Sequence, residues 1–114
     1  IHTYIHNNHR KLNNEQILDL KSINIEYKKL LNLTSKGFTN NELNDLESFN
    51  ILRQSIDNKI SVALNKQIER IQQENVSQKS STLYFTILTE VEYTVDRIEK
   101  LVRLYIDIDK QIND

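Results

Sequence analysis

Three histidines near the start of the chain are spaced as metal ligands on a helix would be. His2, His6 and His9 stand four and three residues apart, so on a helix they would share one face, and imidazole is a common ligand of transition metals. The surrounding segment has weak helical periodicity and no carboxylate close by in sequence to complete a ligand set. The alternative interpretation is a polar lead-in segment in which His6 and His9 bond to helix ends.

A second candidate metal site is a pair of carboxylates one helical turn apart. Glu92 and Asp96 border the apolar face of a predicted helix, and carboxylates on facing helices hold iron or manganese in helical bundles. The same spacing recurs in Glu15 and Asp19, which shows how readily it arises. The alternative is a solvated flank of the helix, where exposed charges contribute little to stability.

The rest of the composition offers few parts for an active site. The 114 residues include no cysteine, methionine, tryptophan or proline and a single glycine, so this sequence has no thiol nucleophile, thiolate ligand or glycine-rich phosphate loop. No side chain stands in the pattern of a nucleophile with its base. The net charge of −1 at pH 7 argues against a nucleic-acid partner, which normally needs a basic surface. We expect no enzyme, and no cofactor unless the carboxylates hold a metal ion.

Size and hydropathy favour one folded domain. Hydrophobic residues make up 38% of the chain and charged residues 27%, which is enough apolar material for a core. No apolar run reaches the roughly 18 residues that cross a bilayer. Because the sequence starts at Ile1 and contains no methionine, we expect it to be one domain of a longer protein.

The first predicted helix follows a lead-in segment over residues 1–12. Asn13 and Gln16 have the spacing of a capping box, and apolar side chains at spacings of three and four then predict a helix over 14–36. Gly37 is predicted to end this helix in the left-handed conformation. Thr39 and Glu42 have the spacing of a second capping box, which would start the next helix after a tight reversal.

Two more helices are predicted over about 40–74 and 78–112. Asn75 is the predicted left-handed stop between them, and Ser77 is the predicted cap of the last helix. Apolar residues of the last helix alternate at spacings of four and three, which is a heptad seam. It consists of Tyr84, Leu88, Val91, Val95, Ile98, Val102 and Tyr105.

These elements predict an all-α fold, an antiparallel three-helix bundle over residues 13–114 with two long helices and one shorter one. The shorter first helix is expected to leave part of the apolar surface of the other two uncovered. Exposed apolar stripes of this kind are interaction sites, so we expect a homodimer. The residues expected at its interface are Leu52, Ile56, Ile60, Leu88, Val95 and Val102.

Three stretches of the chain have a familiar order and spacing. They are His6–Leu12 leading into Asn14–Ile17, then Lys66–Ile71, and then Ser80–Glu90. Together they resemble the PhoU-like C-terminal domain of bacterial inorganic phosphate transporters, especially the sodium-phosphate or PiT-type transporters of Bacteroidetes. The resemblance covers nearly the whole chain.

This resemblance implies a three-helix repeat and a regulatory role in phosphate transport. It places the domain on the cytoplasmic face of the inner membrane, with the membrane part of its own transporter chain as a partner. A Glu-x-x-x-Asp motif binds metal in the family, and Glu92 with Asp96 stands at the corresponding kind of position; the residues between them and the following Lys100 depart from the family pattern. The competing hypothesis is a helical scaffold or signalling bundle unrelated to phosphate transport.

Overall fold

The computed structural model describes residues 12–40 and 46–113, and these residues form three α-helices and no strand. Helix α2 spans Asn14–Asn40, α3 spans Glu47–Gln72 and α4 spans Gln78–Asn113. The all-α class and the three helices are therefore confirmed. The predicted bounds of the last helix are confirmed to within one residue, but the second helix is shorter than predicted. Because α2 and α3 have 27 and 26 residues, only α4, with 36, is long.

Two of the predicted helix starts are confirmed by their hydrogen bonds. The Asn13 backbone N–H donates to Gln16 Oε1 and the Gln16 N–H donates to Asn13 Oδ1, both at 2.9 Å, which completes a capping box. At the start of α4 the Ser80 N–H donates to Ser77 Oγ at 3.0 Å. Each cap pairs backbone donors that the first turn of a helix leaves free.

The turn between α3 and α4 closes one residue earlier than predicted. Glu74, and not Asn75, is in the left-handed region, with φ of 57°. The Glu74 N–H donates to Ile71 O at 3.0 Å and the Asn75 N–H donates to Arg70 O at 2.9 Å. This pair of bonds is a Schellman motif, which requires the left-handed residue two positions after the last helical one. Because α3 ends at Gln72, that position falls on Glu74.

The prediction of a left-handed turn at Gly37 is wrong. Helix α2 continues to Asn40, Gly37 is buried within it, and no glycine in the described residues has positive φ. Just beyond it, Phe38 packs on Tyr105 of α4 with ring centroids 4.9 Å apart. A mid-helix glycine costs only about 1 kcal/mol, which an aromatic contact of this kind offsets. Of the expected next cap, Thr39 lies inside α2 and Glu42 lies outside the described residues.

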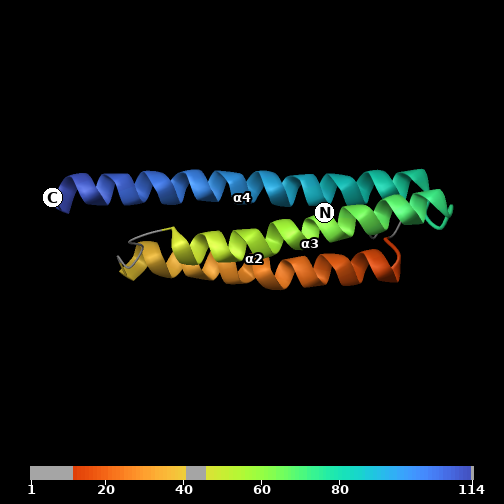
Figure 1. Cartoon of the computed structure of the whole chain (residues 1–114), viewed down its shortest axis with the longest axis horizontal. Helices are drawn as coiled ribbons and strands as arrows, with labels where there is room; N and C mark the ends of the chain where they lie inside the picture. The colour runs from red at the N-terminus through yellow and green to blue at the C-terminus, as the bar shows by residue number, and fades with distance from the viewer. Residues whose placement is uncertain (1–11, 41–45, 114) are drawn as a thin grey trace.

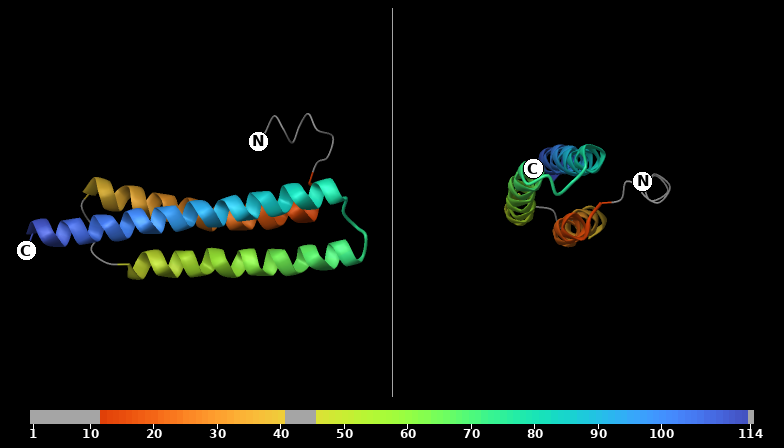
Figure 2. Two further views of the ribbon diagram at one scale, coloured as in Figure 1. Left: turned by 90° about the horizontal axis from the view of Figure 1, so that it is seen from above. Right: turned by 90° about the vertical axis from the view of Figure 1, so that its right-hand side faces the viewer.

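The three helices lie side by side in an elongated body with extents of 58 × 27 × 17 Å. Figure 1 shows the chain passing along α2, coming back along α3 and then passing along α4 in the first direction. Viewed along the helices in Figure 2, α3 lies between the other two, which are spread apart on the opposite side. The buried hydrophobic core comprises Leu12, Ile23, Leu30, Phe49, Ile56, Ile60, Ala63, Tyr84, Leu88, Val95, Val102 and Ile106.

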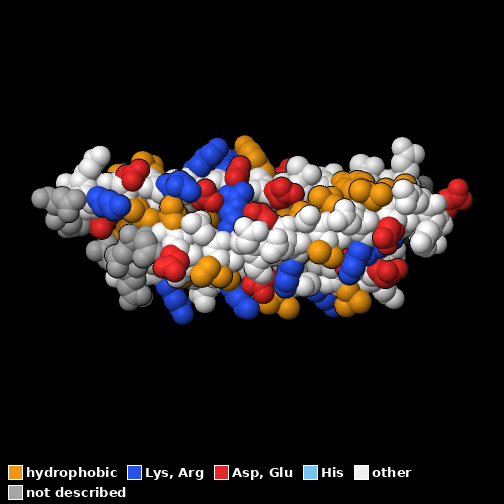
Figure 3. Space-filling view, in the orientation of Figure 1, with side chains coloured by type: hydrophobic (Ala, Val, Ile, Leu, Met, Phe, Trp, Pro, Cys, Tyr) orange, Lys and Arg blue, Asp and Glu red, His pale blue; other side chains and the backbone are white. Residues whose placement is uncertain are grey.

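The face on which α3 lies is a mixed surface. In Figure 3 acidic and basic side chains are spread along its length with hydrophobic side chains between them. None of the three described helices has a stretch with the length and hydropathy that a bilayer crossing requires. The candidate site lies on another side of the bundle, where α2 and α4 spread apart.

Candidate functional site

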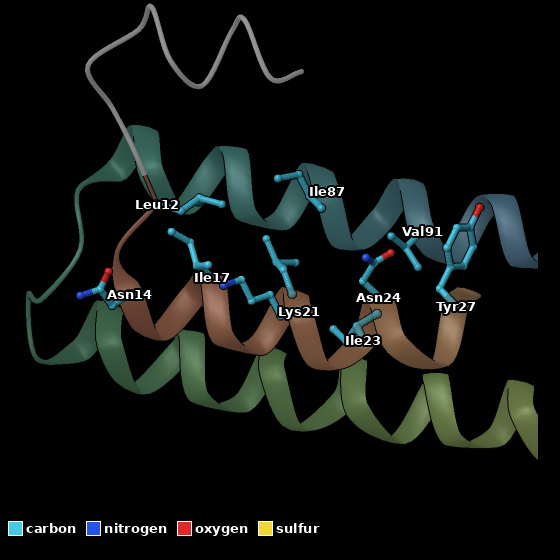
Figure 4. Close-up of a pocket in the computed structure, with 10 residues that line it drawn as sticks. Leu12, Asn14, Ile17, Lys21, Ile23, Asn24, Tyr27, Ile87 and Val91 are labelled. Carbon is cyan, nitrogen blue, oxygen red and sulfur yellow. The ribbon is translucent and has the colours of Figure 1, made fainter. Parts of the chain in front are cut away.

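An apolar groove runs between α2 and α4 on the side away from α3 (Figure 4). Its first hollow has a volume of about 570 Å³ and is lined mainly by α2, with Ile87 and Val91 of α4 opposite. A second hollow of about 960 Å³ continues along α4 and shares Tyr27, Ile87 and Val91 with the first. We call the two together the α2–α4 groove. Its apolar lining is Leu12, Ile17, Leu20, Ile23, Tyr27, Leu83, Ile87 and Val91.

Each helix that borders the groove has a mostly apolar seam at alternating spacings of three and four residues. On α2 the seam, which we call the α2 seam, is Ile17, Leu20, Asn24, Tyr27, Leu31, Thr34 and Phe38. On α4 a second seam, which we call the outer α4 seam, is Ile87, Val91, Thr94, Ile98, Leu101, Tyr105, Ile108 and Ile112. Such spacing is typical of helices that pack along their length against another helix.

The outer α4 seam was not predicted, although its spacing is visible in the sequence. It shares Val91, Ile98 and Tyr105 with the seam that was identified, so one helix carries two overlapping heptad patterns. The residues of the identified seam that are not shared, such as Leu88 and Val95, are buried in the core. A helix with an apolar face this broad is suited to contact two neighbours.

The threonine hydroxyls that line the groove on α4 are already hydrogen-bonded within that helix. The Thr86 hydroxyl donates to Thr82 O at 2.8 Å, and the Thr94 hydroxyl donates to Glu90 O at 2.8 Å. Because these hydroxyl donors are paired within α4, an apolar partner could cover them without leaving a donor unpaired. The groove thus combines an apolar floor with a charged rim, to which Lys21 of α2 and Glu90 of α4 contribute, and this arrangement is typical of interaction surfaces.

A second feature is a buried polar network at the end of the bundle near the α3–α4 turn. Gln16 of α2 donates from Nε2 to Gln67 Oε1 of α3 at 3.1 Å, and Gln67 Nε2 donates to Ser81 Oγ of α4 at 3.0 Å. The Ser80 hydroxyl donates back to Gln16 Oε1 at 3.0 Å. Both glutamines are fully buried. All three helices are therefore joined by side-chain hydrogen bonds that only one relative placement satisfies.

An ion pair extends this network towards the surface. Arg70 donates from Nη1 to Gln67 Oε1 at 2.9 Å and from Nη2 to Asp19 Oδ2 at 2.7 Å, and Tyr84 donates its hydroxyl to the same Asp19 oxygen at 2.9 Å. Burial, followed by the bond to Asp19, raises the pKa of Tyr84 above its usual value of 10.0. The Tyr84 phenol therefore stays protonated as a hydrogen-bond donor, and the Arg70 charge is already matched by Asp19. These bonds link α2, α3 and α4 and so have a structural role; we call this end of the bundle the locked end.

The predicted metal ligands lie beside an arginine. Arg53 of α3 donates from Nη2 to Asp96 Oδ1 at 2.7 Å and from Nη1 to Glu99 Oε1 at 3.0 Å. This bond and the Arg53 charge lower the pKa of the Asp96 carboxyl. Glu92 is exposed one turn away, and among the described residues no group of three or more histidines and carboxylates is placed to hold a metal ion. A cation at Glu92 and Asp96 would compete with Arg53 for the Asp96 carboxylate.

The residues expected at a dimer interface are instead part of the core of the chain itself. Five of the six, Ile56, Ile60, Leu88, Val95 and Val102, are at most 2% exposed, and Leu52 is half-buried against them. Sequence periodicity identified the apolar stripes of α3 and α4 correctly, but these stripes pack inside the bundle, where α3 contacts both α2 and α4. His2, His6 and His9, the other metal candidates, lie outside the described residues.

No family model, curated protein or solved structure matches this chain. The geometry of the α2–α4 groove and the residues quoted above are therefore what the functional proposal is built on.

Proposed function

We propose that this chain is a non-enzymatic interaction module that docks a helical partner on its bundle. The observation that carries this proposal is the α2–α4 groove, which is apolar along its floor and bordered by two seams with helix-packing periodicity. Helical partners bind to such grooves through side chains at heptad spacing. The buried titratable side chains stabilise the bundle itself, because Arg70 and Tyr84 both donate hydrogen bonds to Asp19.

The finer proposal is a regulatory domain of an inorganic phosphate transporter. Its support is the resemblance of His6–Leu12, Lys66–Ile71 and Ser80–Glu90 to PhoU-like C-terminal domains, whose repeat is an antiparallel three-helix bundle of this size. In this proposal the domain lies on the cytoplasmic face of the inner membrane and follows the membrane part of its own chain. It associates with another copy and with that membrane part.

The proposed mechanism is a shift in the association of the bundle. A partner that docks in the α2–α4 groove stabilises one arrangement of the domain. The attached membrane helices change state if one of their two states is more compatible with that arrangement than the other. The effect on transport can be no larger than the difference in docking free energy between the two states.

The test uses the full-length protein in cells that lack other phosphate uptake. We expect removal of residues 12–113 to change the initial rate of radiolabelled phosphate uptake at least twofold, and Ile51→Glu on the outer surface of α3 to leave it unchanged. Membrane-spanning segments before this chain in its full-length protein are also required. Unchanged uptake on removal of the domain, or a parent protein without a membrane part, favours the scaffold or signalling bundle instead.

A further inference from the structure

We infer that the α2–α4 groove, together with the outer α4 seam that continues from it along α4, binds a second copy of this chain, so that the open α2–α4 faces of two copies pack on one another. The inference rests on the proposed function as an interaction module and names its partner and its surface. It differs from the interface expected from sequence, because it uses α2 with α4 and leaves α3 on the outside. It is supported by the exposure of the outer α4 seam and by a comparison of the length of the two seams with the lengths of residues 1–11 and of α4.

The outer α4 seam is incompletely covered by the described part of the chain. Its residues Leu101, Ile108 and Ile112 are 58%, 46% and 74% exposed. The C-terminal part of α4 extends beyond the ends of α2 and α3 in Figure 1, yet the apolar spacing continues through it. Heptad spacing maintained where no helix of the same bundle runs alongside is the pattern of a helix that packs on another chain.

The uncovered surface is longer than residues 1–11 alone could cover as a helix. At 1.5 Å per residue the α2 seam spans about 32 Å and the outer α4 seam about 38 Å, whereas eleven helical residues reach only about 17 Å. An extended segment would reach further, but it would leave its backbone N–H and C=O groups unpaired against an apolar floor. Eight of these eleven residues are also polar or charged.

A second copy has the required length and the required surface. Its α4 has 36 residues, or about 54 Å, and it brings the same two seams that need covering. Packing the two open faces together is self-complementary, as a twofold dimer interface must be. Two helices side by side over the length of the groove offer about 600 Å² per copy, or about 1,200 Å² in total, at the lower end of stable interfaces. The net charge of −1 adds little repulsion between copies.

The experiment compares charged substitutions on the outer α4 seam with one charged substitution of similar exposure on α3. Leu101→Glu lies on the outer α4 seam, and the matched control Ile51→Glu lies on α3, where the side chain is 65% exposed and outside the groove lining. We expect the unmodified chain to be a dimer at about 100 μM by sedimentation and light scattering. Leu101→Glu combined with Ile108→Glu should raise the dissociation constant at least tenfold, because carboxylates would be buried against apolar side chains. Ile51→Glu should change it less than twofold.

Circular dichroism of each variant shows whether the helices are retained, which separates loss of association from loss of folding. A monomeric unmodified chain at this concentration overturns the inference, as does equal dissociation in the seam variant and the control. If removal of residues 1–11 converts a monomer into a dimer, the segment and not a second copy occupies the groove. The phosphate-uptake experiment is independent of these outcomes: a dimer without any effect on uptake refutes the transporter proposal and leaves this interface standing.

Discussion

The two ends of the bundle are held together by different kinds of interaction. Near the α3–α4 turn, buried hydrogen bonds join Gln16, Gln67 and Ser81 across all three helices, and the Arg70–Asp19 pair extends them. At the other end the described contacts between α2 and α4 include the packing of Phe38 on Tyr105, and α4 then projects alone. The comparison indicates that side-chain hydrogen bonds fix the relative placement of the helices at one end, whereas α4 extends past its neighbours at the other. Apolar surface is exposed at both ends, as the α2–α4 groove near the α3–α4 turn and as the outer α4 seam farther along α4.

The largest expected effect comes from breaking the ion pair at the locked end. Arg70→Ala leaves the Asp19 carboxylate partly buried without its main partner, and we expect a loss of about 3–5 kcal/mol in the free energy of unfolding. The matched change Arg53→Ala removes pairs with Asp96 and Glu99, whose side chains are 54% and 23% exposed, so its cost should be clearly smaller. Urea unfolding at one protein concentration measures both. Equal losses would show that the network does not lock the bundle.

A second prediction uses the raised pKa of Tyr84 at the same end. Because its phenol ionises less readily in the folded chain than in the unfolded chain, the stabilisation is fully present below pH 10.0 and is lost as the pH rises above it. Tyr84 contributes up to about 1.4 kcal/mol per pH unit to the slope of the free energy of unfolding against pH. Unfolding measured between pH 9 and 11.5 should be less steep in Tyr84→Phe. A Tyr84→Phe variant that keeps the slope of the unmodified chain contradicts the assignment.

The open end should be less sensitive to truncation. Phe38 is 37% exposed, so we expect Phe38→Ala to reduce the free energy of unfolding by about 1–2 kcal/mol, through loss of the contact with Tyr105. Leu18→Ala, on the same helix but 64% exposed, should stay within about 0.5 kcal/mol. Both are measured at a concentration low enough to keep the chain monomeric. A loss at Phe38 as large as that at Arg70 would remove the difference between the two ends.

The smallest predicted effect concerns the exposed carboxylate of Asp96, which lies between the two ends of the bundle. The Arg53 hydrogen bond holds the pKa of Asp96 below its usual 3.8, so the stabilisation is present above pH 3.8 and is lost as the pH falls through the folded value. The difference in unfolding midpoint between the unmodified chain and Arg53→Gln should therefore shrink from pH 5 to pH 2.5. It should also shrink at 1 M salt, because exposed charges are screened. A difference that is constant with pH would mean that Asp96 gains nothing from Arg53.

Local signals in the sequence predicted the helices better than their ends. The Asn13–Gln16 box and the Ser77 cap depend on side chains that reach backbone groups three residues away, so the sequence within one turn decides them. Gly37 behaved differently because the contact of Phe38 with a residue far along the chain extends α2 through it. The candidate site was only partly predictable: the 3–4 spacing of the outer α4 seam is written in the sequence, but it overlaps the core seam.

The sequence by itself determined that this protein is a bundle of amphipathic helices, because periodicity and capping act over a few residues. Only the tertiary structure decided which apolar face each helix buries. Leu88 and Val95 entered the core, whereas Leu101 and Ile108 stayed exposed on the same helix. That choice depends on where α2 and α3 end relative to α4 and on a network joining residues 51 to 65 positions apart. Neither is contained in any single helical segment, since both result from packing between segments distant in the chain.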